Sequence, residues 1–86
     1  MTQAGSLLIV DDEEMNRDML ARRLAHKGYA VVTAENGMTA LALVERQAFD
    51  LVLLDVMMPD LNGLEVLSEL RRQYLPAELP VIMAPH

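Results

Sequence analysis

Three aspartates stand directly after two apolar segments of the sequence. Carboxylates in these positions could bind a metal ion or act as nucleophiles. Asp11 and Asp12 follow residues 6–10, and Asp55 follows residues 51–54. If these segments are neighbouring strands of one sheet, the three carboxylates converge at one edge, where they repel one another. A hard divalent cation, Mg²⁺ or Mn²⁺, would relieve that repulsion. A carboxylate beside such a metal can also act as a nucleophile and form an aspartyl phosphate.

Acidic residues after strands also have a simpler interpretation, as solvated loop residues or helix N-caps. Asp12 could cap a helix that begins at Glu14, and Glu13 and Glu14 would both favour the N-terminus of that helix. Asp55, which follows a second apolar segment, is not explained in this way. The set of three aspartates therefore favours the metal site.

Short strands and helices are expected to alternate along the chain. The expected strands are residues 6–10, 29–33, 51–54 and 81–84. The expected helices are residues 14–27, a segment after Asn36-Gly37 and a segment after Asn62-Gly63. The first and third strands are continuous apolar runs, which are typical of parallel strands buried on both faces. The sequence therefore predicts an α/β fold with an open parallel sheet, in which ligands bind at the carboxyl ends of the strands.

Each expected helix carries an apolar stripe. The stripe of the first helix consists of Met15, Met19, Leu20 and Leu24. The stripe of the third helix consists of Leu64, Leu67, Leu70 and Tyr74. At 100° per residue, the first stripe spans about 180° of the helix surface, which is wider than one packing face requires.

The composition limits the chain to one small domain. Its 86 residues (9.6 kDa) can bury roughly 60–65% of their surface, which is enough for a single core. The chain is 52% hydrophobic and has no apolar run near ~18 residues, so neither disorder nor a membrane span is expected. A net charge of −6 argues against nucleic-acid binding, and the lack of cysteine excludes thiolate chemistry. The start of the chain does not resemble a signal peptide, so a cytoplasmic location is expected.

Two sequence motifs resemble the receiver domain of two-component response regulators. They are Ile-Val-Asp-Asp-Glu at residues 9–13 and Leu-Leu-Asp-Val-Met-Met-Pro-Asp-Leu-Asn-Gly at residues 53–63. The similarity extends from Leu7 to Met83. It implies a flavodoxin-like (βα)5 fold with strand order 2-1-3-4-5, in which the first and third strands lie side by side. Residues 1–86 would form a single truncated receiver domain, an incomplete (βα)5 unit with four strands and three helices.

The resemblance implies a role for each acidic residue. Asp55 would be the phosphoacceptor, and its partner would be a histidine kinase or a phosphotransfer protein. Asp12, Asp55 and the backbone carbonyl of Met57 would bind Mg²⁺ directly, with Mn²⁺ as an alternative, while Asp11 would act largely through a metal-bound water. Asn62-Gly63 would shape the turn into the third helix. Such a domain is no enzyme beyond its self-phosphorylation and autodephosphorylation.

Two functional positions depart from the family's pattern. A Ser or Thr whose hydroxyl binds the phosphoryl group is replaced by Pro85, and the chain ends at His86, before the family's phosphate-binding lysine. Lys27 is the only lysine, and it would lie about 20 Å away along the first helix. Arg17 could approach the site, although a solvated arginine is the simpler interpretation. We therefore expect impaired phosphotransfer with metal binding largely retained.

An incomplete receiver fold is also expected to expose apolar surface. The fourth strand becomes a free edge and part of the first helix loses its cover, which predicts a homodimer or a domain-swapped assembly. An alternative function is therefore a signalling-inactive interaction or dimerisation module derived from a receiver. A phosphatase with an aspartyl nucleophile is a third alternative. It needs Asp-x-Asp after the first strand, where this chain has Asp11-Asp12-Glu13.

Overall fold

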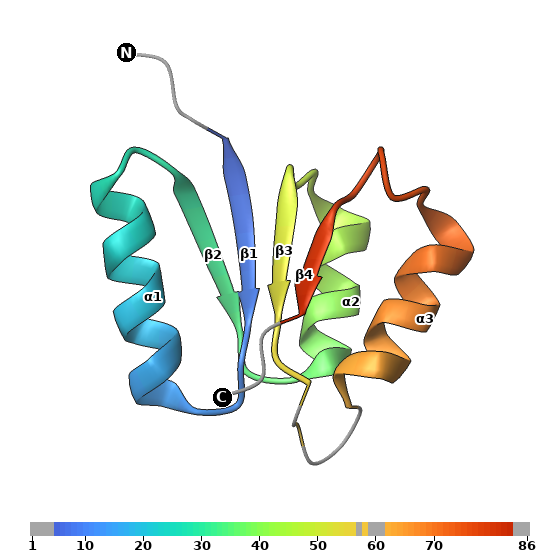
Figure 1. Cartoon of the computed structure of the whole chain (residues 1–86), viewed down its shortest axis with the longest axis horizontal. Coiled ribbons are helices and arrows are strands. Elements are labelled where there is room, and N and C mark those ends of the chain that lie inside the picture. The colour runs from blue at the N-terminus through green and yellow to red at the C-terminus, as the bar shows by residue number, and fades with distance from the viewer. Residues whose placement is uncertain (1–4, 57, 59–61, 84–86) are drawn as a thin grey trace.

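Strands and helices alternate throughout the computed structural model, which describes residues 5–56, 58 and 62–83. The elements are β1 (Ser6–Val10), α1 (Glu14–His26), β2 (Ala30–Ala34), α2 (Gly37–Arg46), β3 (Leu51–Leu54), α3 (Gly63–Gln73) and β4 (Val81–Met83) (Figure 1). The predicted order is confirmed, and β2 is shifted by one residue from its expected position. The predicted end of the last strand, Ala84, lies outside the described residues.

The four strands form one parallel sheet in the order β2-β1-β3-β4. Val10 at the end of β1 is aligned with Leu54 at the end of β3. The residues that follow these two strands therefore emerge side by side at the carboxyl edge. This order confirms the predicted parallel sheet, and it supplies the neighbour relation that the spacing of the strands along the sequence does not determine.

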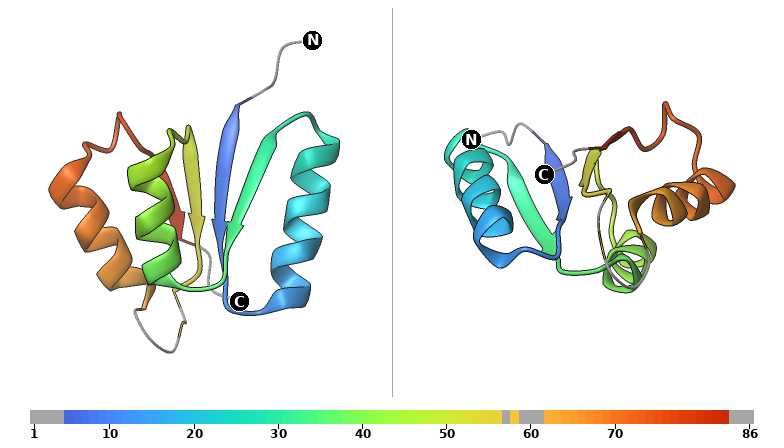
Figure 2. Two further views of the ribbon diagram at one scale, coloured as in Figure 1. Left: turned by 180° about the vertical axis from the view of Figure 1, so that it is seen from behind. Right: turned by 60° about the horizontal axis from the view of Figure 1, so that its bottom comes forward.

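The helices are divided unequally between the two faces of the sheet. Figure 2 shows α1 on one face and α2 with α3 on the other. The main core lies on the side of α2 and α3 and includes Leu8, Val10, Val52, Leu54, Val66 and Leu70. In contrast, α1 has no buried residue, and the Met15 and Met19 side chains are 81% and 44% exposed. Part of the wide apolar stripe of α1 is therefore exposed, as predicted.

The buried face of α3 contains only part of its apolar stripe. Its buried residues are Gly63, Val66 and Leu70, whereas Leu64 is 62% exposed. At 100° per residue, Leu64 lies roughly 120° from the centre of that buried face. The sheet therefore does not cover Leu64, and Val66, which lies outside the apolar stripe named above, is buried instead.

Both Asn-Gly pairs mark the start of a helix. The Asn36 side chain accepts a hydrogen bond from the Thr39 backbone N–H at 2.8 Å, and the Asn62 side chain accepts one from the Glu65 N–H at 3.0 Å. Each asparagine is the N-cap of its helix, and such a cap stabilises a helix by about 1 kcal/mol. The cap at Asn62 fixes the start of α3 close to the end of β3.

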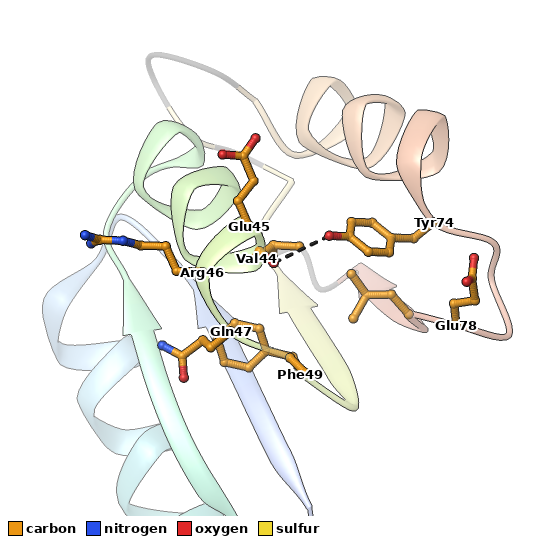
Figure 3. Close-up of a pocket in the computed structure, with 9 residues that line it drawn as sticks. Val44, Glu45, Arg46, Gln47, Phe49, Tyr74 and Glu78 are labelled. Atoms are coloured by element: carbon orange, nitrogen blue, oxygen red, sulfur yellow. Dashed lines mark hydrogen bonds between the residues drawn. The ribbon is translucent and has the colours of Figure 1, made fainter.

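A hollow of about 480 Å³ lies beside the C-terminus of α2 and the connection from α3 to β4 (Figure 3). Phe49 and Leu79 contribute to its lining, and both stand before the strands β3 and β4 rather than after them. The Tyr74 hydroxyl donates to the Val44 carbonyl at 3.5 Å across this hollow. It is therefore at the opposite end of the sheet from the three aspartates.

Within residues 5–56, 58 and 62–83, none of the helices has the length and apolarity needed to cross a bilayer.

Candidate functional site

The structure brings Asp11, Asp12 and Asp55 together at the carboxyl edge of the sheet. One carboxylate oxygen from each residue lies within 4.8 Å of the other two. The backbone places them there: the Asp11 N–H donates to Ala34 O at 3.1 Å, and the Asp55 N–H donates to Val10 O at 2.9 Å. These hydrogen bonds extend the parallel pairing beyond β1 and β3, so the side chains converge because the strands are neighbours.

The three carboxylates differ in their exposure to solvent. Asp11 and Asp55 are each 3% exposed, whereas Asp12 is exposed. Burying acidic groups close together is costly unless positive charge or hydrogen bonds compensate it. Three oxygen donors at this separation match the preference of hard divalent cations such as Mg²⁺. The donor set therefore fits such a cation.

Asp11 is held by the beginning of α1. Its Oδ1 accepts from the Glu13 N–H at 2.9 Å, and its Oδ2 accepts from the Asn16 side-chain amide. The Arg17 guanidinium donates through Nη1 to the Asp11 backbone carbonyl at 2.9 Å. Arg17 therefore reaches the neighbourhood of the site, where its guanidinium is hydrogen-bonded to the main chain.

Asn16 was missed by the sequence reasoning. Its position five residues after Asp11, in the first turns of a helix that starts beside that aspartate, is the signal that could have revealed it.

The alternative role of Asp12 as a helix N-cap is also wrong. The N-cap of α1 is Glu13, and its side chain makes no capping hydrogen bond. The Asp11 side chain accepts the Glu13 N–H instead. Asp12 is therefore not used to cap α1, and its carboxylate lies in the acidic cluster.

Gly63 allows α3 to start against the end of β3. Its N–H donates to Val56 O at 3.1 Å. A Cβ atom at this position would lie 2.4 Å from Asp55 O and 2.7 Å from Val56 Cα. Because both neighbours are backbone atoms, only glycine fits without a shift of the chain. The predicted role of Asn62-Gly63 in the turn is thus given a steric basis.

Several predicted residues are far from the cluster or outside the described residues. Lys27 is the C-cap of α1, at the opposite end of the helix from Glu13, in line with the predicted distance. Met57, whose carbonyl was predicted to bind the metal, lies outside the described residues, as do Pro85 and His86. For these three residues the interpretation still rests on the sequence.

The fold and site define an open parallel α/β domain with a cluster of carboxylates where β1 and β3 end. Comparison with known families identifies this class: residues 7–85 match the response regulator receiver domain. The chain therefore belongs to the receiver domain family, and the predicted fold class and family are confirmed. Receiver domains are signalling domains of two-component systems rather than classical enzymes.

Individual relatives agree with this assignment. The chain is 41% identical over 81 residues to TcrX, a probable transcriptional regulatory protein of Mycobacterium tuberculosis, covering 94% of this chain and 34% of the relative. It is 44% identical over 77 residues to the alkaline phosphatase synthesis transcriptional regulatory protein PhoP of Bacillus subtilis, covering 90% and 31%. The chain thus spans about a third of the length of these curated relatives.

A solved structure shows the same fold. The response regulator TrrA of Thermotoga maritima, in complex with Mg²⁺-BeF, has a TM-score of 0.86 and 39% sequence identity to this chain. The alignment covers 93% of this chain and 68% of the TrrA chain.

Proposed function

We propose that the chain acts as one receiver domain in which Asp55 accepts a phosphoryl group in an Mg²⁺-dependent reaction. The observation that carries this proposal is the convergence of three carboxylates within 4.8 Å, two of them on buried residues. The phosphodonor would be the phosphohistidine of a histidine kinase or of a phosphotransfer protein. The Mg²⁺-BeF complex of TrrA supports the same chemistry.

Phosphotransfer in this site is an in-line substitution at phosphorus. A carboxylate oxygen of Asp55 attacks the phosphorus, the new O–P bond forms, and the P–N bond to the donor imidazole breaks with its electron pair left on nitrogen. Asp12, Asp55 and the Met57 carbonyl would hold Mg²⁺, with Mn²⁺ able to replace it. The cation, when bound, neutralises charge on the phosphoryl oxygens. Asp11 would contribute by orienting a water molecule bound to the cation, while the buried location of Asp55 would limit competing hydrolysis.

Intact-mass measurement tests this function. Incubation with acetyl phosphate and Mg²⁺ should add about 80 Da to the chain. Removing the cation with EDTA should abolish the gain, because the clustered carboxylates would then repel the incoming phosphoryl group. Adding back Mg²⁺ or Mn²⁺ should restore it. A chain that gains no mass from acetyl phosphate or from a phosphorylated histidine kinase contradicts the proposal.

We also propose that the reaction is slow. The support is Pro85, which stands where the family's hydroxyl is expected and which offers no hydrogen-bond donor to a phosphoryl oxygen. The rate of the mass gain should therefore rise in the Pro85→Thr variant. Equal rates in the two proteins would exclude Pro85 as the cause of a slow reaction.

The relatives' names support a place for this domain in regulators of transcription. Regulators of transcription act on DNA, which bacteria hold in the cytoplasm. We therefore propose a cytoplasmic location. No direct contact of this acidic domain with nucleic acid is proposed.

A second candidate function is association between copies of this chain, as a homodimer or a domain-swapped assembly. The specific observation is a row of aligned apolar residues on the α1 side of the sheet: Ile9 pairs with Leu53, and Leu53 pairs with Ile82. Ile82 is 52% exposed and lies on β4, an edge strand, while α1 packs against β1 and β2. Uncovered apolar surface next to an edge strand favours self-association.

Replacing Ile82 with lysine tests this association. The 86-residue chain should form dimers at micromolar concentration in size-exclusion chromatography with light scattering, and Ile82→Lys should shift it to monomer. Leu75→Lys is the matched control, because Leu75 is 66% exposed but lies in the connection between α3 and β4. A monomeric parent chain, or equal effects of the two substitutions, contradicts this candidate.

A further inference from the structure

Asn16 lies beside the acidic cluster, but the reaction proposed above gives it no role. It lies in α1, and its side-chain amide donates to Asp11 Oδ2, while the Glu13 N–H donates to Asp11 Oδ1 at 2.9 Å. Each oxygen of this carboxylate therefore has its own donor. Because Asp11 is only 3% exposed, neither donor is easily exchanged for water. The Asp11 carboxylate is thus fixed in position before any cation binds.

Arg17 holds the same residue from the main-chain side. Its Nη1 donates to the Asp11 carbonyl at 2.9 Å, and one turn of α1 thus fixes both the backbone and the side chain of Asp11. A shift of the Asp11 carboxylate toward a cation would break the Asn16 and Glu13 hydrogen bonds together. Breaking hydrogen bonds to a charged, buried acceptor is costly.

We propose that Asn16 is a positioning residue that keeps Asp11 out of direct contact with the cation and makes the site selective for Mg²⁺ over Ca²⁺. The inference rests on the metal site proposed above. An oxygen that already accepts a hydrogen bond has a lone pair left for a metal-bound water, but this carboxylate cannot turn to bind an ion through both oxygens.

The two cations differ in what they need from such a carboxylate. Mg²⁺ is small, favours octahedral coordination and keeps several of its waters, so it tolerates a carboxylate that binds only its water. Ca²⁺ takes six to eight oxygen ligands and often uses a carboxylate through both oxygens. A fixed Asp11 carboxylate therefore cannot supply direct oxygen ligands that Ca²⁺ requires, whereas the affinity for Mg²⁺ is reduced only a little.

Calorimetric titration of the metal-free chain with Mg²⁺ and with Ca²⁺, without any phosphodonor, tests this inference. Asn16→Ala frees Asp11 Oδ2, and the ratio of the Ca²⁺ dissociation constant to that of Mg²⁺ should fall roughly tenfold, a typical effect of losing a partner of a metal-binding group. Asn16→Gln keeps an amide on a longer stem and should restore part of the ratio. It also provides a folded variant if the alanine variant is unstable.

Asn36→Ala is the matched control. It removes an asparagine that caps α2, so it should lower the melting temperature while leaving the ratio of the two dissociation constants unchanged. If the ratio is unchanged in both Asn16 variants, or if the binding of both cations is weakened equally, the proposed role of Asn16 is overturned but the metal site is not. A parent chain that binds neither cation overturns the metal site as well, so the two failures are distinguishable.

Discussion

The Asp55→Asn variant should gain no mass on incubation with acetyl phosphate and Mg²⁺, whereas the unsubstituted chain should gain about 80 Da. The amide replaces the carboxylate at nearly the same size, so it removes the negatively charged nucleophile with little change in packing. Asp55 is 3% exposed at the end of a buried strand, and a substitution of equal volume is well tolerated there. The loss should therefore be complete while the protein remains folded.

Asp50→Asn is the control for this substitution. Asp50 stands directly before β3 instead of after it, and its Oδ2 accepts from the Ser6 N–H at 2.7 Å. It thus lies at the opposite end of the strand from Asp55 and should not affect the reaction. The two variants make the same chemical change on either side of β3. Phosphorylation that persists in Asp55→Asn would assign the modification to another side chain and would contradict the role proposed for Asp55.

The alternating pattern of the chain was predictable because apolar runs and Asn-Gly pairs are local signals. The runs at β1 and β3 indicated buried parallel strands, and Asn36 and Asn62 indicated helix starts. The contact between β1 and β3 was not predictable from spacing alone, because the order of strands in a sheet depends on crossovers. Here the resemblance to a family supplied it, and with it the expectation that Asp11 and Asp55 meet.

Details of packing and hydrogen bonding were less accessible from the sequence. In the apolar stripe of α3, Leu70 is fully buried but Leu64 is 62% exposed, and Val66, which the stripe did not include, is fully buried as well. The spacing of leucines alone does not show which side of a short helix faces the sheet. The links from Asn16 and Arg17 to Asp11 depend on the path of the loop into α1, which no local pattern determines. The sequence therefore identified the acidic residues but not the side chains that hold them.

Gly63→Ala should reduce both the stability of the fold and the affinity for Mg²⁺. The added methyl group would lie 2.4 Å from Asp55 O and 2.7 Å from Val56 Cα, and these backbone atoms cannot rotate away as a side chain could. Overpacking of this kind costs about 1–3 kcal/mol, which lowers the melting temperature of a domain of this size by roughly 10 °C. Relief of the clash must move α3 away from the residue that carries the proposed nucleophile.

Gly28→Ala separates the loss of stability from the change in the site. Gly28 has φ +102° and no atom within 4 Å of an added Cβ, so alanine there costs about 1–2 kcal/mol through backbone strain alone. Gly28 follows α1 at the end remote from Asp11 and Asp12. Calorimetric titration should therefore show weaker Mg²⁺ binding in Gly63→Ala and parental binding in Gly28→Ala, with both melting temperatures lowered. Equal Mg²⁺ affinities in the two variants would show that the backbone of Asp55 tolerates the displacement and that Gly63 serves the packing of α3 alone.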